Sequence, residues 1–242
     1  YEFFIIKNTE GYLLDCDIEL KDDLIKHLLK YKLRSKVEIK DLSSSHVIGV
    51  VSEEKFLEIQ SEINSKEKTI IYRDSPCFLD PRNTLLGARI LSSLEKLHLT
   101  IKKLNLKIIE KSNYLKLAHA QGIPIQGVKK LQDNLFGLES NFEELNGVDF
   151  KKGCYVGQEN TARMKLKNKL RRRLLPVVSE TTLKVSDEIK FKESVVGRVL
   201  IDGECSFALI KLFDPEFKVF SKQNLKVNEC DVQILAPSKF NI

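Results

Sequence analysis

One short stretch of the sequence combines residue types that are suited to chemistry. Residues 151–159 read KKGCYVGQE, so a single cysteine lies among two lysines, two glycines and a polar Gln-Glu pair. A thiol reacts or binds metal as the thiolate, and neighbouring lysine charges or a helix start favour that form. The residues after Gly157 are typical of a helix start, whose exposed N–H groups and positive dipole end act in the same direction. Cys154 is therefore a candidate nucleophile, redox centre or metal ligand, and the alternative is a reduced cysteine that fills the core.

A run of positive charge follows this motif. Residues 163–173 read RMKLKNKLRRR, which predicts a strongly positive surface. Such a surface attracts polyanions, either nucleic acid or the glutamate tail of a cofactor. The alternative without a binding role is a solvated helix end followed by an exposed strand.

Composition limits the class of protein. The 242 residues are 42% hydrophobic and 31% charged with a formal net charge of +6, which is typical of a globular protein. The five cysteines are odd in number and scattered, with no Cys-x-x-Cys, which argues against a disulfide scaffold or a zinc finger. No apolar run has membrane-spanning length and residues 1–6 do not resemble a signal peptide, so we expect an intracellular protein. Because the chain begins with a strand-like segment and not with Met, we also expect an N-terminal portion to be missing.

Hydrophobic spacing predicts an α+β body over residues 1–170. The expected strands are residues 3–7, 12–17, 37–42, 47–51, 69–72, 78–79 and 84–91, and the expected helices are residues 20–31, 53–63, 112–122 and 128–135. A polar gap at residues 64–68 marks an internal boundary of this body.

From residue 171 the pattern changes to short strands. These are residues 174–178, 188–192, 195–201, 204–212 and 230–235, and Asp202-Gly203 is a strong hairpin turn. The pattern predicts a second domain over residues 171–242, an antiparallel β-barrel or sandwich.

The motifs resemble those of a known family. The segment KGCYVGQE at residues 152–159, followed by Arg163, Arg172 and Arg173, is similar to the signature of the YgfZ family, folate-binding relatives of the glycine-cleavage T-protein. The stretches YKLRSKV at residues 31–37, DPR at 80–82, LGAR at 86–89 and GIP at 122–124 also resemble family segments. The sequence departs from the family pattern at Ile125, where many members of the family carry an acidic residue.

The resemblance implies a fold and a function. The implied fold has two ferredoxin-like α/β halves and a C-terminal barrel, with a tetrahydrofolate pocket in a central channel. The implied role is the assembly or maintenance of iron-sulfur proteins, with the motif cysteine required. We expect an accessory factor without steady turnover, a monomer, whose partners are iron-sulfur enzymes or cluster assembly proteins and folate.

The candidate residues follow from the chemistry of folate. A carboxylate is the natural acceptor for the amino-pyrimidine edge of a pterin, and the candidates are Glu139 and Glu159. The anionic tail would pair with Arg89 or Arg163, and Tyr155 would stack on the ring or pack in the core. Lys152, Gly153, Gly157 and Gln158 complete the expected folate set around the motif. One thiolate cannot hold a stable cluster, so we expect Cys154 to be a transient iron or cluster ligand and expect no resident metal.

Two other functions remain open. One is a folate-dependent one-carbon transferase like the T-protein. The other is an RNA-binding protein linked to tRNA modification, which would contact tRNA through residues 163–173 and lose affinity steeply with salt. The expected location is the bacterial cytoplasm, with the mitochondrial matrix as the alternative.

Overall fold

The computed structural model describes residues 1–8, 11–167, 170–240 and 242. It divides the chain into two compact units, Tyr1–Glu110 and Lys111–Ile242. Within the described residues, no helix is both long enough and apolar enough to cross a bilayer.

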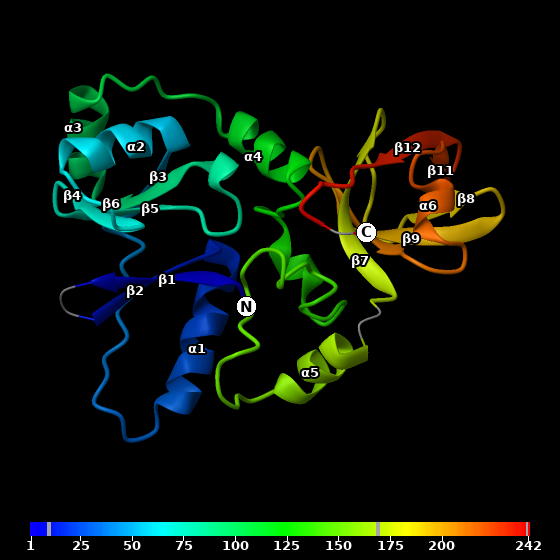
Figure 1. Ribbon diagram of the computed structural model, residues 1–242, viewed down its shortest axis with the longest axis horizontal. Coiled ribbons are helices and arrows are strands. Elements are labelled where there is room, and N and C mark those ends of the chain that lie inside the picture. The colour runs from blue at the N-terminus through cyan, green and yellow to red at the C-terminus, as the bar shows by residue number, and fades with distance from the viewer. Residues whose placement is uncertain (9–10, 168–169, 241) are drawn as a thin grey trace. The chain divides into compact units, whose positions relative to one another are not determined.

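The first unit is built on a four-stranded antiparallel sheet in the order β3-β6-β5-β4 (Figure 1). Its strands are β3 (Val47–Val51), β4 (Thr69–Tyr72), β5 (Ser75–Leu79) and β6 (Ala88–Ser92). The helices of the unit are α1 (Lys21–Lys32), α2 (Glu53–Glu62) and α3 (Leu94–Lys103). Ser52 and Ser93 cap α2 and α3, because their side chains accept from the backbone N–H groups of Lys55 and Lys96.

Both faces of this sheet are covered. Cys77 and Ile90 pack with Phe56 and Ile59 of α2 in one core cluster. The adjacent residues Phe78 and Leu91 belong to a different cluster, with Ile6 of the hairpin β1 (Phe3–Asn8) and β2 (Gly11–Cys16). Successive side chains of a strand point to opposite faces, so α2, together with Leu97 of α3, covers one face and the hairpin covers the other.

The motif DPR at residues 80–82 has a structural role in this unit. Asp80 is fully buried and accepts from Arg82 Nε (3.0 Å), Arg82 Nη2 (2.7 Å) and the backbone N–H of Arg82. Arg82 also pairs with Glu2 over 3.0 Å. The ion pair between Asp80 and Arg82 fixes the turn that leads towards β6.

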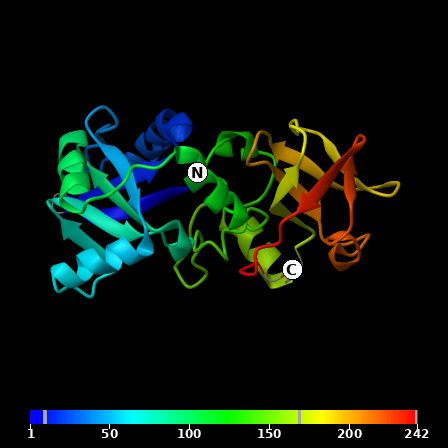
Figure 2. The ribbon, with the colours of Figure 1, turned by 90° about the horizontal axis from the view of Figure 1, so that it is seen from above.

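The second unit contains a closed barrel in the order β10-β7-β12-β11-β8-β9 (Figures 1 and 2). The strands are β7 (Arg172–Ser179), β8 (Glu188–Phe191), β9 (Ser194–Ile201), β10 (Phe207–Lys211), β11 (Leu225–Val227) and β12 (Cys230–Ile234). Fully buried side chains include Leu175, Ile189, Val199, Ile210 and Val232, one from each of five strands. Outside the strands lie α4 (Lys111–Ala120), α5 (Gln158–Lys167) and α6 (Phe217–Phe220).

The predicted fold class is confirmed: a mixed α/β body carries a C-terminal antiparallel barrel. β7 begins at Arg172, one residue after the predicted boundary, and a separate domain over residues 171–242 stays a prediction. The strand predicted at residues 37–42 is wrong. Five of its six residues are exposed and no strand pairs with it in the described structure, while Asp41 accepts from Lys21 Nζ (2.7 Å) and the Ser43 N–H (2.9 Å) to hold a turn. The stretch 84–91 is also not one strand, since a 3-10 turn (Thr84–Leu86) precedes β6.

Candidate functional site

The KGCYVGQE motif forms an exposed loop that leads into α5. Gly157 has φ +84°, a value that glycine adopts at little cost, and no atom lies within 4 Å of where its Cβ would be. The Gln158 side chain accepts from the Tyr155 backbone N–H (3.1 Å), and the Gln158 N–H donates to the Tyr155 carbonyl oxygen (3.3 Å). The predicted helix start after Gly157 is therefore confirmed, with α5 beginning at Gln158.

Cys154 differs from the other cysteines in its accessibility. Its side chain is exposed, whereas Cys77 is buried and Cys16, Cys205 and Cys230 are partly buried. Burial raises the pKa of the Cys77 thiol to about 12, and it also raises the pKa of Cys16 and Cys205. These three thiols are thus disfavoured as thiolates, while Cys154 is open to reagents and partners.

The lysines of the motif make local contacts. The Nζ of Lys152 lies 4.5 Å from the ring centroid of Tyr155, a cation–π contact. The backbone N–H of Lys151 donates to Asp149 (2.7 Å). Gly153 has open space where a Cβ would stand, so its surroundings would accept a side chain. Tyr155 is half-buried under the lysine.

Glu139 is a buried carboxylate that other groups hold in place. Its Oε1 accepts from Arg172 Nε over 2.9 Å, and its Oε2 accepts from Arg172 Nη2 (3.3 Å) and from the Phe136 backbone N–H (3.0 Å). The Glu139 side chain is 5% exposed and that of Arg172 is 44% exposed. The Glu139 carbonyl oxygen also accepts from the Leu174 N–H of β7. The carboxylate therefore has a fixed position beneath one half-exposed guanidinium.

The remaining candidates are more dispersed. Glu159 and Arg163 are exposed on α5, and no ion pair of either is seen among the described residues. Arg89 belongs to the first unit, where it pairs with Asp15 (2.6 Å from Nη2) and lies 4.8 Å from the Phe4 ring centroid. The structure places Cys154 and Tyr155 in one loop, with Gln158 at the first position of α5, whereas Arg89 makes its contacts inside a different unit.

The predicted positive surface is partly neutralised. Lys165 pairs with Glu143, Arg172 with Glu139 and Arg173 with Glu144. The positions Asn168 and Lys169 of the run lie outside the described residues. The sequence analysis did not predict a role for Glu143 or Glu144. Residues 139–144 contain three glutamates, whose negative charges match the positive charges of the basic run and could have indicated the pairing.

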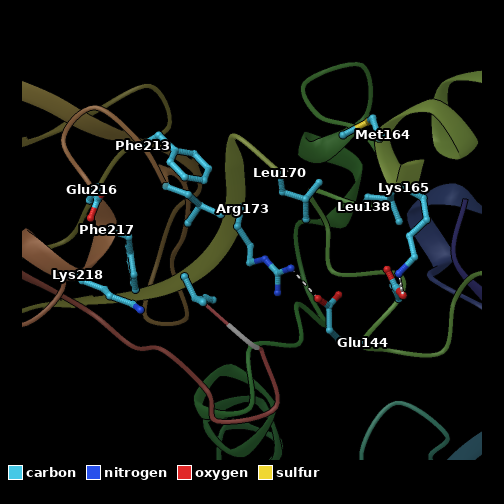
Figure 3. Close-up of a pocket in the computed structure, with 13 residues that line it drawn as sticks. Leu138, Glu144, Met164, Lys165, Leu170, Arg173, Phe213, Glu216, Phe217 and Lys218 are labelled. Atoms are coloured by element: carbon cyan, nitrogen blue, oxygen red, sulfur yellow. Dashed lines mark hydrogen bonds and ion pairs between the residues drawn. The ribbon is translucent and has the colours of Figure 1, made fainter. Parts of the chain in front are cut away.

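A pocket of about 580 Å³ lies in the second unit, next to these pairs (Figure 3). The side chains that line it are Leu138, Glu143, Glu144, Met164, Lys165, Leu170, Arg173, Leu212, Phe213, Glu216, Phe217, Lys218 and Ile242. Seven of these side chains are apolar and six are charged, three of each sign. Sequence reasoning did not predict this pocket.

Two further observations bear on chemistry in the second unit. His119 is buried, its Nε2–H donates to the Ser206 carbonyl oxygen (2.8 Å), and its ring contacts Phe207 edge-on. Burial lowers the pKa of His119, which favours the neutral ring of a structural histidine. In the described part of the chain, no group of three or more His, Cys, Asp or Glu side chains is arranged to hold a metal ion.

Comparison with known proteins identifies relatives. The chain is 32% identical to the mitochondrial iron-sulfur cluster assembly factor IBA57 homolog of Dictyostelium discoideum, over 70% of this chain and 41% of that protein. It is 36% identical to the mitochondrial iron-sulfur cluster assembly factor IBA57 of Mus musculus (74% of this chain, 49% of that protein) and 34% identical to that of Homo sapiens (70% and 46%). The chain thus spans less than half the length of these curated relatives. No protein-family model matches it.

A solved structure has the same fold. The glycine cleavage system aminomethyltransferase T of Bartonella henselae aligns with 98% of this chain and 71% of its own chain, with a TM-score of 0.61. The sequence identity is 8%, so this similarity concerns the fold alone.

Proposed function

The chain belongs to the YgfZ family, which includes the iron-sulfur cluster assembly factors that it resembles in sequence, and on this premise we propose that it assists the assembly or maintenance of iron-sulfur proteins. In this proposal it is a tetrahydrofolate-binding accessory factor. The relatives named above are mitochondrial, which favours the mitochondrial matrix over the bacterial cytoplasm. The monomeric state stays a prediction.

The observation that carries the proposal is the exposed Cys154 at the entry to α5. An accessible thiol on a loop can meet iron, sulfur or a cluster held by another protein, and soft thiolates suit each of these. Stable clusters need about four ligands, so Cys154 would share a cluster with its partner and not keep one. Its partners are accordingly cluster assembly proteins or the iron-sulfur enzymes themselves.

Folate binding is supported by the chemistry of Glu139. The planar guanidinium of Arg172 presents a row of N–H donors to this carboxylate. The 2-amino-pyrimidine edge of a pterin presents a similar planar donor pair, so Glu139 fits a pterin in place of Arg172. Bound tetrahydrofolate would supply one-carbon and redox chemistry. Glu139 would orient the ring, and Arg163, which lies on the exposed side of α5, would attract the anionic tail.

Folate binding is tested by calorimetric titration of the full-length protein with tetrahydrofolate. We expect Glu139→Gln to weaken binding by at least about tenfold, because a charge-assisted hydrogen-bond pair is lost. Arg172→Gln is the matched variant, and it should bind as well as the wild type or better, because a competing donor has gone. Equal affinity of the wild type and Glu139→Gln would exclude Glu139 as the pterin ligand, and absence of binding to the folded wild type would refute the folate proposal.

The assembly role is tested by complementation. In cells that lack their own family member, expression of the complete gene should restore aconitase activity to at least about half the normal value, while the amount of aconitase protein stays constant. An empty vector is the control. A well-expressed protein that restores nothing would contradict the role in iron-sulfur protein assembly.

The two alternatives have less support. The aminomethyltransferase similarity concerns the fold at 8% identity and carries no activity to this chain. The hypothesis of tRNA binding depends on the basic run at residues 163–173. Three cations of this run are already paired with glutamates. Pairing reduces the positive potential that a polyanion would meet.

A further inference from the structure

The end of α1 in the first unit combines positive charge with exposed apolar side chains. Residues 26–37, here called the α1 patch, read KHLLKYKLRSKV and contain five cations and no acidic residue. No ion pair of Lys30, Arg34 or Lys36 is seen within the described residues. The same stretch exposes four large apolar side chains, those of Leu29, Tyr31, Leu33 and Val37. Cations and apolar groups are thus both available to a partner.

Leu33 is held outward at a cost. It is 86% exposed and has φ +48°, a value at which a bulky side chain is strained. It is also the C-cap of α1, at the end of a helix where glycine commonly takes up such a conformation. Neither the strain nor the exposure is explained by a contact within the protein, which indicates that the Leu33 side chain meets something outside it.

The patch has one continuous outer face. Lys26, Leu29, Lys30 and Leu33 follow the spacing i, i+3, i+4 and i+7, so they share one side of α1, and all four are exposed. Leu24 is buried and lies on the other side of the helix. In Figure 1 the end of α1 points away from the four-stranded sheet of its unit, and the chain then returns to β3.

This chemistry fits an anionic membrane surface better than other polyanions. Such a surface offers negative headgroups to the cations and an apolar phase to Leu29 and Leu33. Nucleic acid offers phosphates, and bases on which Tyr31 could stack, but no apolar phase for leucines. Protein interfaces are depleted of lysine, whereas residues 26–37 contain four lysines.

We propose that the α1 patch binds peripherally to a bilayer that contains anionic phospholipids. Lys30, Arg34 and Lys36 would lie at the headgroups, and Leu29 and Leu33 would enter the boundary with the acyl chains. The proposal uses neither Cys154 nor Glu139, and it does not rest on the proposed assembly function.

The test is co-sedimentation of the full-length protein with vesicles of two compositions. One is phosphatidylcholine alone, and the other is phosphatidylcholine mixed with phosphatidylglycerol, which is anionic. We expect binding to the anionic vesicles to be at least about tenfold tighter, because each cation near an anionic surface contributes about fivefold. Added salt should weaken the binding, since it screens exposed charges.

The cations are tested by the triple variant Lys30→Gln, Arg34→Gln and Lys36→Gln. Its affinity for anionic vesicles should fall by at least about tenfold. The matched control is Lys184→Gln, Lys190→Gln and Lys211→Gln, which removes the same charge from exposed positions of the second unit. This control should bind like the wild type, because it leaves the α1 patch unchanged.

The apolar contact is tested by Leu33→Ser, which should lower the affinity by about fivefold or more. Leu166→Ser is the matched control, because Leu166 is 85% exposed on α5 and also lies among cations. Leu33→Gly gives a further readout. It should weaken vesicle binding and raise the melting temperature, because glycine adopts the positive φ without strain. A purely structural leucine would change the melting temperature alone.

Four results would overturn the proposal. These are no vesicle binding by the folded full-length protein, equal binding to both vesicle compositions, equal effects of Leu33→Ser and Leu166→Ser, and tighter binding to a uridine oligonucleotide than to anionic vesicles. The last result would assign the α1 patch to RNA. Circular dichroism establishes that each variant is folded. Loss of folate binding or of complementation would leave vesicle binding unaffected, so this proposal and the assembly proposal fail separately.

Discussion

Gly87→Ala is expected to destabilise the first unit by more than about 3 kcal/mol, because two costs add. Gly87 has φ +76°, where a non-glycine residue costs about 1–3 kcal/mol. An added Cβ would also lie 2.0 Å from the Val51 carbonyl oxygen, which is backbone and cannot rotate away. Val51 pairs with Ala88, so relief of the clash must separate the ends of β3 and β6.

The measurement is urea unfolding of the full-length protein, with hydrogen exchange of β3 and β6 to locate the change. Gly203→Ala is the matched control: its φ is +95°, but no atom lies within 4 Å of the new Cβ. It carries the dihedral cost without the clash, so we expect it to lose about 1–3 kcal/mol, less than Gly87→Ala. An unfolding midpoint for Gly87→Ala equal to that of the wild type would show that β3 and β6 accommodate the methyl group.

Local patterns predicted much of the fold. Alternation and turn residues gave the β1–β2 hairpin, and the Asp202-Gly203 turn lies between β9 and β10 as expected. Helices α1, α2 and α4 follow from their apolar spacing. Predictions failed where contacts between distant segments determine the secondary structure. Residues 37–42 have strand-forming composition but no partner strand in the described structure, and the three-residue β11 is too short to give a periodic signal.

The candidate site was predictable only in part. The exposed Cys154 loop and the helix start after Gly157 follow from local sequence, because glycines and helix-entry residues act over a few positions. The glutamates that pair with the basic run could not be predicted from local sequence. Glu144 and Arg173 are 29 positions apart, and only the fold brings their side chains together. For the same reason Arg89, a folate candidate by residue type, proved to be held by Asp15.

The pairing of the basic run also changes what residues 163–173 do. Arg172 and Arg173 connect the start of β7 to the segment that precedes the Cys154 loop, through Glu139 and Glu144. Lys165 of α5 holds Glu143 of the same segment. The cations therefore fix the region around the motif, and substitution of one of them would alter its packing as well as its charge.

Cys154→Ser should strongly lower function without affecting the fold. A serine hydroxyl is a far weaker ligand for iron or sulfur chemistry than a thiolate, so aconitase activity in the complemented cells should fall by at least about tenfold. The side chain is exposed, and surface substitutions of this kind change stability by only about 0.5 kcal/mol or less. The melting temperature and the soluble amount should therefore match the wild type.

The matched control for this prediction is Cys205→Ser. Cys205 is a partly buried thiol outside the motif, and its pKa is raised by burial, so its loss should leave complementation intact. A result in which both serine variants complement equally would make Cys154 an ordinary surface residue, and a result in which both fail would point to general sensitivity to thiol loss. Failure of Cys154→Ser alone, at normal abundance, would assign the chemistry to the loop that leads into α5, because the two variants differ only in which thiol is removed.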